Sequence, residues 1–233
     1  MYLINPYIFA KASWKPTDIT GCTLWLDAGQ GITKDINDYV SVWADQSGNG
    51  YNASQETGTY QPLWSGNTLN GNPVIRFDGS DDVLKTNSFT INNEYTYFAV
   101  WITTGTFDAL CSQESGTYGY YNYIQYYQPN GVYGGCGEGN VIYAKPTFPT
   151  YIITSFTAKS NEAKIWENGI YKSQNSVYTI LTTNAVFDIG RRGAMYPQYL
   201  HGNVAEIIIY NQILDTSDRQ TVETYLNAKY AIY

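Results

Sequence analysis

Histidine and cysteine are scarce in this sequence. His201 is the only histidine, and the three cysteines are Cys22, Cys111 and Cys136. No two cysteines form a C-x-x-C pair and His201 has no partner at metal-ligand spacing, so the sequence excludes a zinc site. A disulfide between Cys111 and Cys136 across a hairpin and three buried, reduced thiols both remain open.

Basic residues and long apolar runs are also few. The chain has 13 Lys and Arg against 20 Asp and Glu, a net charge of −7 at pH 7. Phosphate backbones and anionic lipids repel such a chain, so we expect neither nucleic acid nor a membrane as its partner. The N-terminus has no basic lead, and no run of about 18 apolar residues follows, so we expect no Sec signal and no membrane span.

The residue patterns of common hydrolases are missing. No glutamate is followed two residues later by an aspartate, so the paired-carboxylate pattern of retaining glycosidases of β-sandwich fold is absent. The sequence contains no nucleophile-elbow motif around a serine, so His201 has no nucleophile to activate. Glu206 lies on an apolar strand without a companion, and we expect it to be a paired structural carboxylate. The sequence therefore predicts that the chain is not an enzyme.

Aromatic residues and glycine are abundant instead. The 24 tyrosines favour half-buried strands and the 21 glycines favour turns, so the pattern predicts an all-β fold. Residues 22–28 and 94–103 alternate as strands, residues 204–210 read as a buried strand, and residues 53–72 read as a long polar loop. We expect one β-sandwich domain over residues 22–233, preceded by an arm at residues 1–21.

A helix is predicted after Leu214. Asp215 or Thr216 can cap its first turn. Its apolar residues recur at helical spacing, so one face should lie against the sandwich. The residues at this spacing are Val222, Tyr225, Leu226 and Lys229.

Four motifs in order carry a family resemblance. They are Leu-Trp-Leu-Asp-Ala at 24–28, Trp-Ala-Asp-Gln-Ser-Gly-Asn-Gly at 43–50, Val-Ile-Arg-Phe-Asp-Gly-Ser-Asp-Asp at 74–82, and Gly-Asn-Val-Ala-Glu-Ile at 202–207 with the helix ending at 225–230. The chain resembles the laminin-G-like, concanavalin A-like lectin/glucanase superfamily, especially members in phage virion proteins and bacterial surface proteins. The resemblance implies a two-sheet antiparallel jelly-roll sandwich with a C-terminal α-helix.

The same resemblance suggests a function. It implies a non-catalytic component of the virion surface, such as a capsid decoration, head-fibre or tail module, with affinity for cell-surface or environmental glycan. A bacterial carbohydrate-binding module or a glycoside hydrolase-related protein is the alternative. This superfamily hosts lectins, enzymes and plain structural domains, so the fold alone does not decide between them.

Tyrosines crowd the stretch from residue 115 to residue 143. On a strand, Tyr121, Tyr123 and Tyr127 would share one face, where flat rings beside amide side chains suit a sugar. The same composition suits a protein interface, or rings that merely cover the outer face of a sheet. We keep the three residues as candidate carbohydrate-binding residues.

Acidic residues in two turns raise the question of a metal. Asp78, Asp81 and Asp82, with Asp45 and Asn49, could offer hard oxygen ligands to calcium, as some members of the resembled superfamily do. The spacing does not match an EF-hand loop, and turn-forming side chains account for the same residues without a metal. We expect no cofactor, with calcium as the alternative.

The arm holds apolar side chains that water would not tolerate in a patch. We expect it either to pack back on the sandwich or to dock on a neighbouring subunit or another virion protein, in an oligomeric assembly. The candidate docking residues are Tyr2, Ile4, Tyr7, Phe9 and Trp14.

Overall fold

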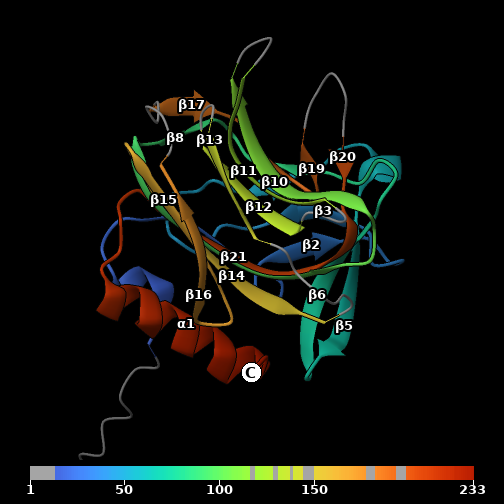
Figure 1. Cartoon of the computed structure of the whole chain (residues 1–233). Helices are drawn as coiled ribbons and strands as arrows, with labels where there is room; N and C mark the ends of the chain where they lie inside the picture. Colours follow the sequence, from blue (N-terminus) through green and yellow to red (C-terminus); the bar gives the residue numbers. More distant parts are fainter. Residues whose placement is uncertain are drawn as a thin grey trace, which may run out of the picture.

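Alternation along the strands produces two facing sheets. In the computed structural model, which describes residues 14–115, 119–127, 131–136, 139–143, 150–176, 182–192 and 198–233, the sheets pack face to face and one helix, α1 (Thr216–Tyr230), covers the outer side of one of them (Figure 1). Neighbouring strands of both sheets pair antiparallel throughout the described residues. This confirms the predicted concanavalin A-like jelly-roll sandwich with a C-terminal helix.

The eight-stranded sheet carries the helix. Its long path has the spatial order β16, β15, β14, β9, β21, β6 and β5, and β1 pairs with the second half of β21. The bounds are β16 (Ile170–Asn175), β15 (Glu162–Glu167), β14 (Ile152–Lys159), β9 (Glu94–Thr103), β21 (His201–Tyr210), β6 (Asn72–Asp78), β5 (Leu63–Leu69) and β1 (Cys22–Asp27).

The nine-stranded sheet forms the other layer, in the order β13, β12, β11, β10, β18, β7, β4, β3 and β2. Its bounds are β13 (Gly139–Tyr143), β12 (Gly131–Cys136), β11 (Gly119–Tyr127), β10 (Phe107–Ser115), β18 (Phe187–Ile189), β7 (Leu84–Lys85), β4 (Ala53–Ser54), β3 (Val40–Trp43) and β2 (Ile32–Lys34). Two small pairs and two short 3₁₀ helices complete the described elements. They are β17 (Thr183–Ala185) with β8 (Phe89–Ile91), β19 (Arg191–Arg192) with β20 (Gln198–Tyr199), η1 (Pro16–Asp18) and η2 (Gly58–Tyr60).

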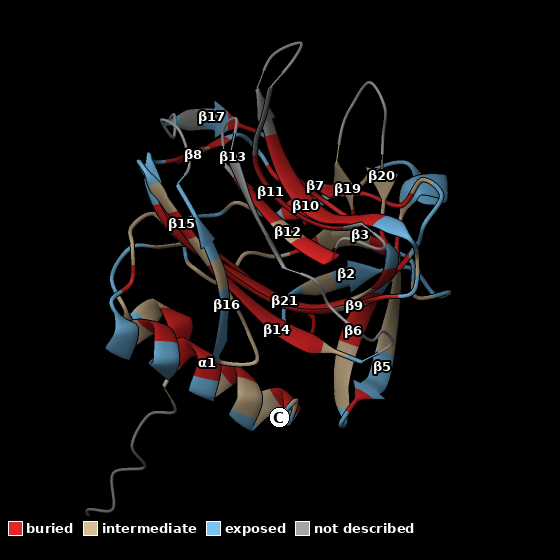
Figure 2. Ribbon diagram, in the orientation of Figure 1, coloured by how far each residue is buried: buried red, intermediate tan, exposed pale blue. Residues whose placement is uncertain are grey.

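Two apolar clusters hold the layers together (Figure 2). Along β9, Tyr97 and Trp101 point into the cluster between the sheets, whereas Phe98 and Val100 point into the cluster beneath α1. Since both faces of β9 are covered and β14 and β21 flank it, the prediction of a central strand at residues 94–103 is confirmed.

The helix begins and ends as its sequence predicts. The Asp215 carboxylate accepts a hydrogen bond from the Asp218 backbone amide at 2.8 Å, which caps the first turn. At the other end Ala231 adopts a left-handed conformation with φ of 48°. Among the described residues no helix has the length and apolar character that a bilayer crossing requires.

The prediction of a long polar loop at residues 53–72 is wrong. This stretch contains β4, η2 and β5. Strand β5 lies at the edge of its sheet, where it pairs with β6 and forms one isolated bridge from Leu63 to Tyr39. Its register with β6 shifts between Ser65 and Leu69. An edge strand with one covered face and an irregular register lacks the apolar alternation that would reveal it in a sequence.

The cysteines are free where the structure describes them. Cys22 and Cys111 form no disulfide, and burial raises the pKa of each thiol to about 12. Strand β11 lies between Cys111 on β10 and Cys136 on β12. Two strand spacings, about 9.6 Å, exceed the reach of a disulfide, so the predicted alternative of a Cys111–Cys136 bond is wrong.

The described part of the predicted arm contacts the sandwich. The Tyr210 hydroxyl donates to the Pro16 carbonyl at 2.9 Å, and the Gln212 amide donates to the Thr20 carbonyl at 2.7 Å. Trp14 packs on Tyr225 of α1 with ring centroids 5.2 Å apart. Four candidate docking residues, Tyr2, Ile4, Tyr7 and Phe9, lie outside the described residues.

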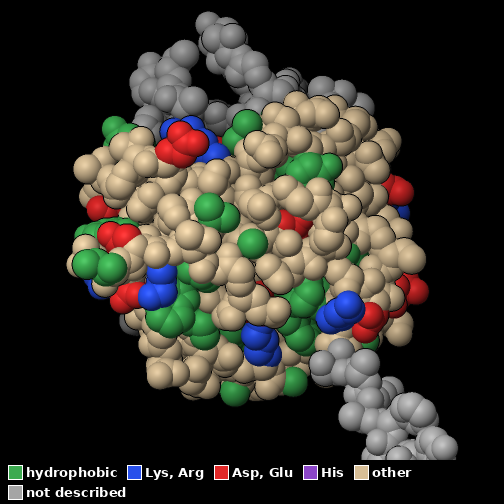
Figure 3. Space-filling view, turned by 180° about the vertical axis from the view of Figure 1, so that it is seen from behind, with side chains coloured by type: hydrophobic (Ala, Val, Ile, Leu, Met, Phe, Trp, Pro, Cys, Tyr) green, Lys and Arg blue, Asp and Glu red, His purple; other side chains and the backbone are tan. Residues whose placement is uncertain are grey.

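Charge is sparse on the surface. Only 14% of the residues are charged, and on the face in Figure 3 acidic and basic side chains lie scattered among uncharged ones. Single charged groups therefore have a large influence on what any local hollow can bind.

Candidate functional site

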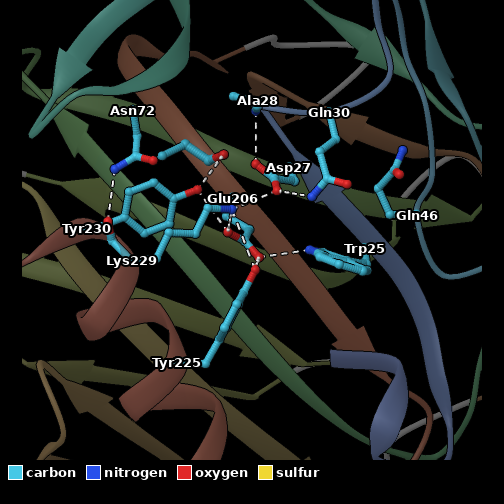
Figure 4. A network of polar contacts seen from close by, with 12 residues as sticks. Trp25, Asp27, Ala28, Gln30, Gln46, Asn72, Glu206, Tyr225, Lys229 and Tyr230 are labelled. Atoms are coloured by element: carbon cyan, nitrogen blue, oxygen red, sulfur yellow. Dashed lines mark hydrogen bonds and ion pairs between the residues drawn. The ribbon is translucent and has the colours of Figure 1, made fainter. Parts of the chain in front are cut away.

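A buried carboxylate pair lies where β1, β21 and α1 meet. Asp27 at the end of β1 is the direct cross-strand partner of Glu206 on β21. Both residues are 1% exposed. Their side chains lie on the face of the sheet that α1 covers, and Figure 4 shows Lys229 and two tyrosines of the helix converging on them.

Every oxygen of the Glu206 carboxylate is occupied. Oε1 accepts hydrogen bonds from the Trp25 indole at 2.8 Å and the Tyr225 hydroxyl at 2.9 Å. Oε2 accepts from the Lys229 ammonium at 2.7 Å and the Tyr230 hydroxyl at 2.8 Å. Four donors, one from β1 and three from α1, thus satisfy one buried anion, as burial of a charge requires.

Asp27 shares the same cation. The Lys229 ammonium lies 2.6 Å from Asp27 Oδ2, which also accepts from the Gln30 amide, and Oδ1 accepts from the Gly29 backbone at 2.9 Å. Burial raises the pKa of Glu206, whereas Lys229 acts in the opposite direction. Burial and the neighbouring Glu206 charge raise the pKa of Tyr225, so its hydroxyl stays a donor.

This buried polar network has a structural role, because it joins β1, β21 and α1. Two carboxylates close to one nitrogen could suggest a retaining glycosidase, whose acids stand about 5–5.5 Å apart. A catalytic carboxylate must reach a substrate, but the Glu206 side chain is fully buried and the Asp27 side chain, which lines an adjoining groove, is only 2% exposed. All four oxygens of the pair accept hydrogen bonds. The prediction that Glu206 is a paired structural carboxylate is confirmed, but the expectation that it has no companion is wrong, because strand pairing brings Asp27 beside it.

A groove runs beside the network. Its volume is about 960 Å³, and the rings of Trp14, Trp25 and Tyr225 form its apolar wall. Trp25 is only 7% exposed, and Trp14 covers Tyr225. Trp14, one of the predicted docking residues, therefore packs on the helix of its own chain.

The outer face of the nine-stranded sheet carries a row of polar residues. Strand pairing aligns Ser54, Lys85, Asp188, Ser112 and Tyr123 from β4 to β11. Their neighbours along each strand point into the core, since Leu84, Cys111, Ile124 and Ile189 all belong to the cluster between the sheets. The row therefore lies on the side away from α1.

Tyr123 is covered on this face. It is 6% exposed, its ring lies against Gly135, and the Arg192 guanidinium stands 3.9 Å from the ring centroid. A sugar could stack on this ring only after Arg192 moved. The side chains of Tyr121 and Tyr127 lie outside the described residues, so carbohydrate binding by the three tyrosines stays a prediction.

A hollow of about 710 Å³ opens further along the same face, above β4 and β7 and beside the β19–β20 pair. Tyr60, which is 44% exposed, and Tyr199 contribute aromatic rings to it, and Val186 adds an apolar surface that is 38% exposed. The polar lining comes mostly from β4, β7 and the turns that follow them. It comprises Ser54, Gln55, Glu56, Thr57, Asp81, Lys85, Thr86, Asn87 and Arg191.

The two cations of the hollow differ. The Arg191 guanidinium donates to the Asp188 carboxylate through Nε at 2.9 Å and through a second, shorter contact, and this neighbour raises the pKa of Arg191 against the opposing effect of burial. In the part of the chain that the structure describes, the Lys85 ammonium and the Asn87 amide have no hydrogen-bond or ion-pair partner. These two groups are free to meet a ligand.

Three acids meet at the edge of this region. Oxygens of Asp78, Asp81 and Asp82 lie within 4.8 Å of one another. They could supply three of the six to eight oxygen ligands that Ca²⁺ takes. Asp45 and Asn49 lie in another turn.

That other turn uses its polar side chains internally. The Asp45 carboxylate accepts from the backbone amides of Trp25, Ser47 and Tyr51, and the Asn49 amide donates to the Thr23 carbonyl. Asp45 and Asn49 therefore act as the turn-forming side chains that the interpretation without a metal expects, and they lie apart from the three acids of the other turn.

Comparisons with known proteins support the fold. No protein-family model and no curated protein matches the sequence. Trypanosoma rangeli sialidase in complex with sialic acid is similar to 90% of this chain over 33% of its own, with a TM-score of 0.64 and 13% identity. The botulinum neurotoxin type G receptor binding domain is similar over 89% of this chain and 52% of its own, with a TM-score of 0.63 and 9% identity.

The neurotoxin serotype D binding domain gives the same result, with a TM-score of 0.61 and 13% identity over 88% of this chain and 51% of its own. This chain thus spans about a third of the sialidase and about half of the neurotoxin domains. At such identities the likeness shows a shared lectin-like β-sandwich fold, and function depends on the site.

Proposed function

We propose that this chain is a non-catalytic carbohydrate-binding domain, and that its sugar site is the hollow on the outer face of the nine-stranded sheet. The observation that carries the proposal is that the exposed Tyr60 ring lines the same hollow as Lys85 and Asn87, whose side chains have no partner among the described residues. A sugar presents an apolar ring face to an aromatic side chain and a hydroxyl edge to amides and charges, so this combination fits it. Similarity to a sialidase crystallised with sialic acid supports the same class of ligand.

The proposal includes the absence of catalysis. Asp27 and Glu206, which come closest to a glycosidase pair, are buried and fully hydrogen-bonded. Incubation of the purified chain with β-glucans, galactans and host polysaccharides should release no reducing ends. Turnover that disappears in Glu206→Gln would overturn this part of the proposal.

A glycan array tests the binding site with a matched pair of tyrosines. Tyr60 and Tyr39 are equally exposed, at 44%, but only Tyr60 lines the hollow. Tyr60→Ala should weaken glycan binding about tenfold, because the loss of one well-packed aromatic contact costs about 1.4 kcal/mol or more. Tyr39→Ala should bind as the wild type does. An equal loss in both variants, or a wild type that binds no glycan on a broad array, argues against the proposal.

We also propose that the domain is displayed on a phage virion. The four ordered motifs that resemble virion members of the laminin-G-like superfamily favour this location. A mass-spectrometric inventory of purified virions tests it, and absence of the chain from every particle would leave the bacterial carbohydrate-binding module as the better assignment.

A further inference from the structure

We infer that the sugar unit held in the hollow carries a carboxylate, and that Lys85 is its counter-ion. This inference rests on the proposed carbohydrate-binding function and adds the chemical class of the ligand.

The Lys85 ammonium has no hydrogen-bond or ion-pair partner among the described residues, although its backbone is held by two neighbouring strands. Strand β7 lies between β18 and β4, and Lys85 pairs in register with Asp188 on one side and Ser54 on the other. Leu84 before it is fully buried, so the lysine side chain starts from a fixed backbone at the floor of the hollow. Asp188, the acid nearest in register, is already held by Arg191.

Most lysines of the described chain are paired. Apart from Lys15 and Lys85, the described lysines each form an ion pair with an acid, namely Lys34, Lys159, Lys164, Lys172 and Lys229. A cation on a central strand beside exposed aromatic and apolar side chains is suited to an anionic group of a bound molecule. The neighbouring Asn87 amide offers a second donor to the same group.

The remaining charges limit the kind of anion. Glu56 and Asp81 also line the hollow, and the whole chain carries a net charge of −7. These acids repel a polyphosphate or a heavily sulfated chain, but they accept hydrogen bonds from hydroxyl groups. A uronic or sialic acid fits this lining, because its single carboxylate can pair with the Lys85 ammonium and its ring hydroxyls can donate to Glu56 and Asp81.

Paired ligands with and without the carboxylate test this inference. The probes are sialyllactose against lactose, and trigalacturonate against its carboxyl-reduced form, measured by isothermal titration calorimetry. The acidic member of at least one pair should bind about tenfold more tightly, because a hydrogen bond to a charged group contributes about 1.5–3 kcal/mol. Raising the salt concentration should reduce the difference.

Variants of Lys85 test whether this residue causes the preference for the acidic probe. Lys85→Gln should abolish the preference for the acidic probe and leave binding of the neutral probe unchanged, whereas Lys85→Arg should retain the preference. Lys164→Gln removes the same charge from β15 on the other sheet and should behave as wild type. Melting curves of all three variants check that the fold is intact.

The outcomes separate the inference from the function on which it rests. Equal binding of acidic and neutral probes, or an acidic preference that survives in Lys85→Gln, overturns the role of Lys85 but leaves a carbohydrate-binding domain. Failure of every acidic and neutral probe, together with a blank glycan array, overturns both.

Discussion

The two outer faces of this sandwich treat charge in opposite ways. On the face beneath α1, Glu206 has four hydrogen-bond donors and Lys229 bridges it to Asp27. On the outer face of the nine-stranded sheet, Lys85 and Asn87 lie in an open hollow without partners among the described side chains. The closed face uses its charged groups to stabilise the fold, whereas the two polar groups on the open face remain available to a ligand.

Two of the four motifs that carry the resemblance belong to the closed face. Trp25 and Asp27 come from the first motif, Glu206 from the fourth, and Tyr225 and Lys229 from the helix that follows it, and all five meet in one network. A buried charge needs all its partners together, so these five residues act as one set. The first and fourth motifs therefore report how the sandwich is closed, whereas Asp81 of the third motif lines the open hollow.

The largest decrease in the free energy of unfolding should come from disrupting the buried network around Glu206. Glu206→Ala leaves the Trp25 indole and two tyrosine hydroxyls without the carboxylate that accepts from them, and leaves Lys229 with Asp27 alone. Loss of one partner from a buried ion pair costs about 3–5 kcal/mol. Guanidinium unfolding should show this decrease in the free energy of unfolding, and Glu206→Gln, which keeps an acceptor oxygen, should lose less.

An exposed glutamate provides the control for this experiment. Glu162 forms surface pairs with Lys159 and Lys164, and Glu162→Ala should cost less than about 1 kcal/mol. If Glu206→Ala and Glu162→Ala lose similar amounts of unfolding free energy, the network contributes no more than a surface ion pair. The two faces would then not differ in how charge stabilises them.

The closed face was largely predictable from the sequence. Period-2 alternation located β1 and β9, the capping Asp215 located the start of α1, and the apolar setting of Glu206 indicated a paired carboxylate. These features are local, or they follow from burial. Asp27 as its partner was not predictable, because 179 residues of chain separate two positions that only the β1–β21 register brings together.

The open face was not predictable. Its hollow is lined from β4 and β7, each only two residues long, and from turns that read as polar loop. Such short segments have no measurable periodicity. The tyrosine-rich strand β11 does belong to this sheet, but Arg192 covers Tyr123. The two residues are far apart in the sequence, so no local pattern predicts their contact.

A smaller effect should follow from disturbing the open face at Tyr123. A methyl group at Gly135 would meet the Tyr123 ring, so Gly135→Ala should displace the ring from beneath Arg192. Overpacking of this kind costs about 1–3 kcal/mol. Thermal unfolding measures the loss, and Gly58→Ala, where a methyl group meets nothing within 4 Å, is the control. An unchanged melting temperature in Gly135→Ala would mean that the Tyr123 ring is not held in this packing.

The helix cap gives a still smaller effect confined to the closed face. Asp215→Ala removes the acceptor of the Asp218 amide and should lower the free energy of unfolding by about 1 kcal/mol. Affinity for whichever glycan the wild type binds should stay the same, because the hollow lies on the other sheet. A changed affinity would show that the two faces are coupled, which the contrast between them does not predict.

The smallest effect concerns Asp82, a buried carboxylate whose charged neighbours are acids instead of a lysine. It is 7% exposed, and burial, with Asp78 and Asp81 beside it, raises its pKa to about 7 from an ordinary value near 3.8. A group that binds its proton more tightly in the folded state stabilises the fold at low pH, and this contribution is lost as the pH rises from about 4 to about 7. Water reaches Asp78 and screens the turn, which keeps the effect small.

Comparison of Asp82→Asn with the wild type isolates this contribution. The amide keeps an oxygen that can accept from the Asp78 backbone but cannot ionise, so the variant should gain stability relative to the wild type between pH 5 and pH 8. Urea midpoints measured across that range give the difference, and millimolar Ca²⁺ should shrink it at pH 8 if the three acids bind the ion. A difference between the two proteins that is constant with pH would mean that Asp82 ionises normally, and that this turn tolerates an unpaired buried carboxylate that the face beneath α1 does not.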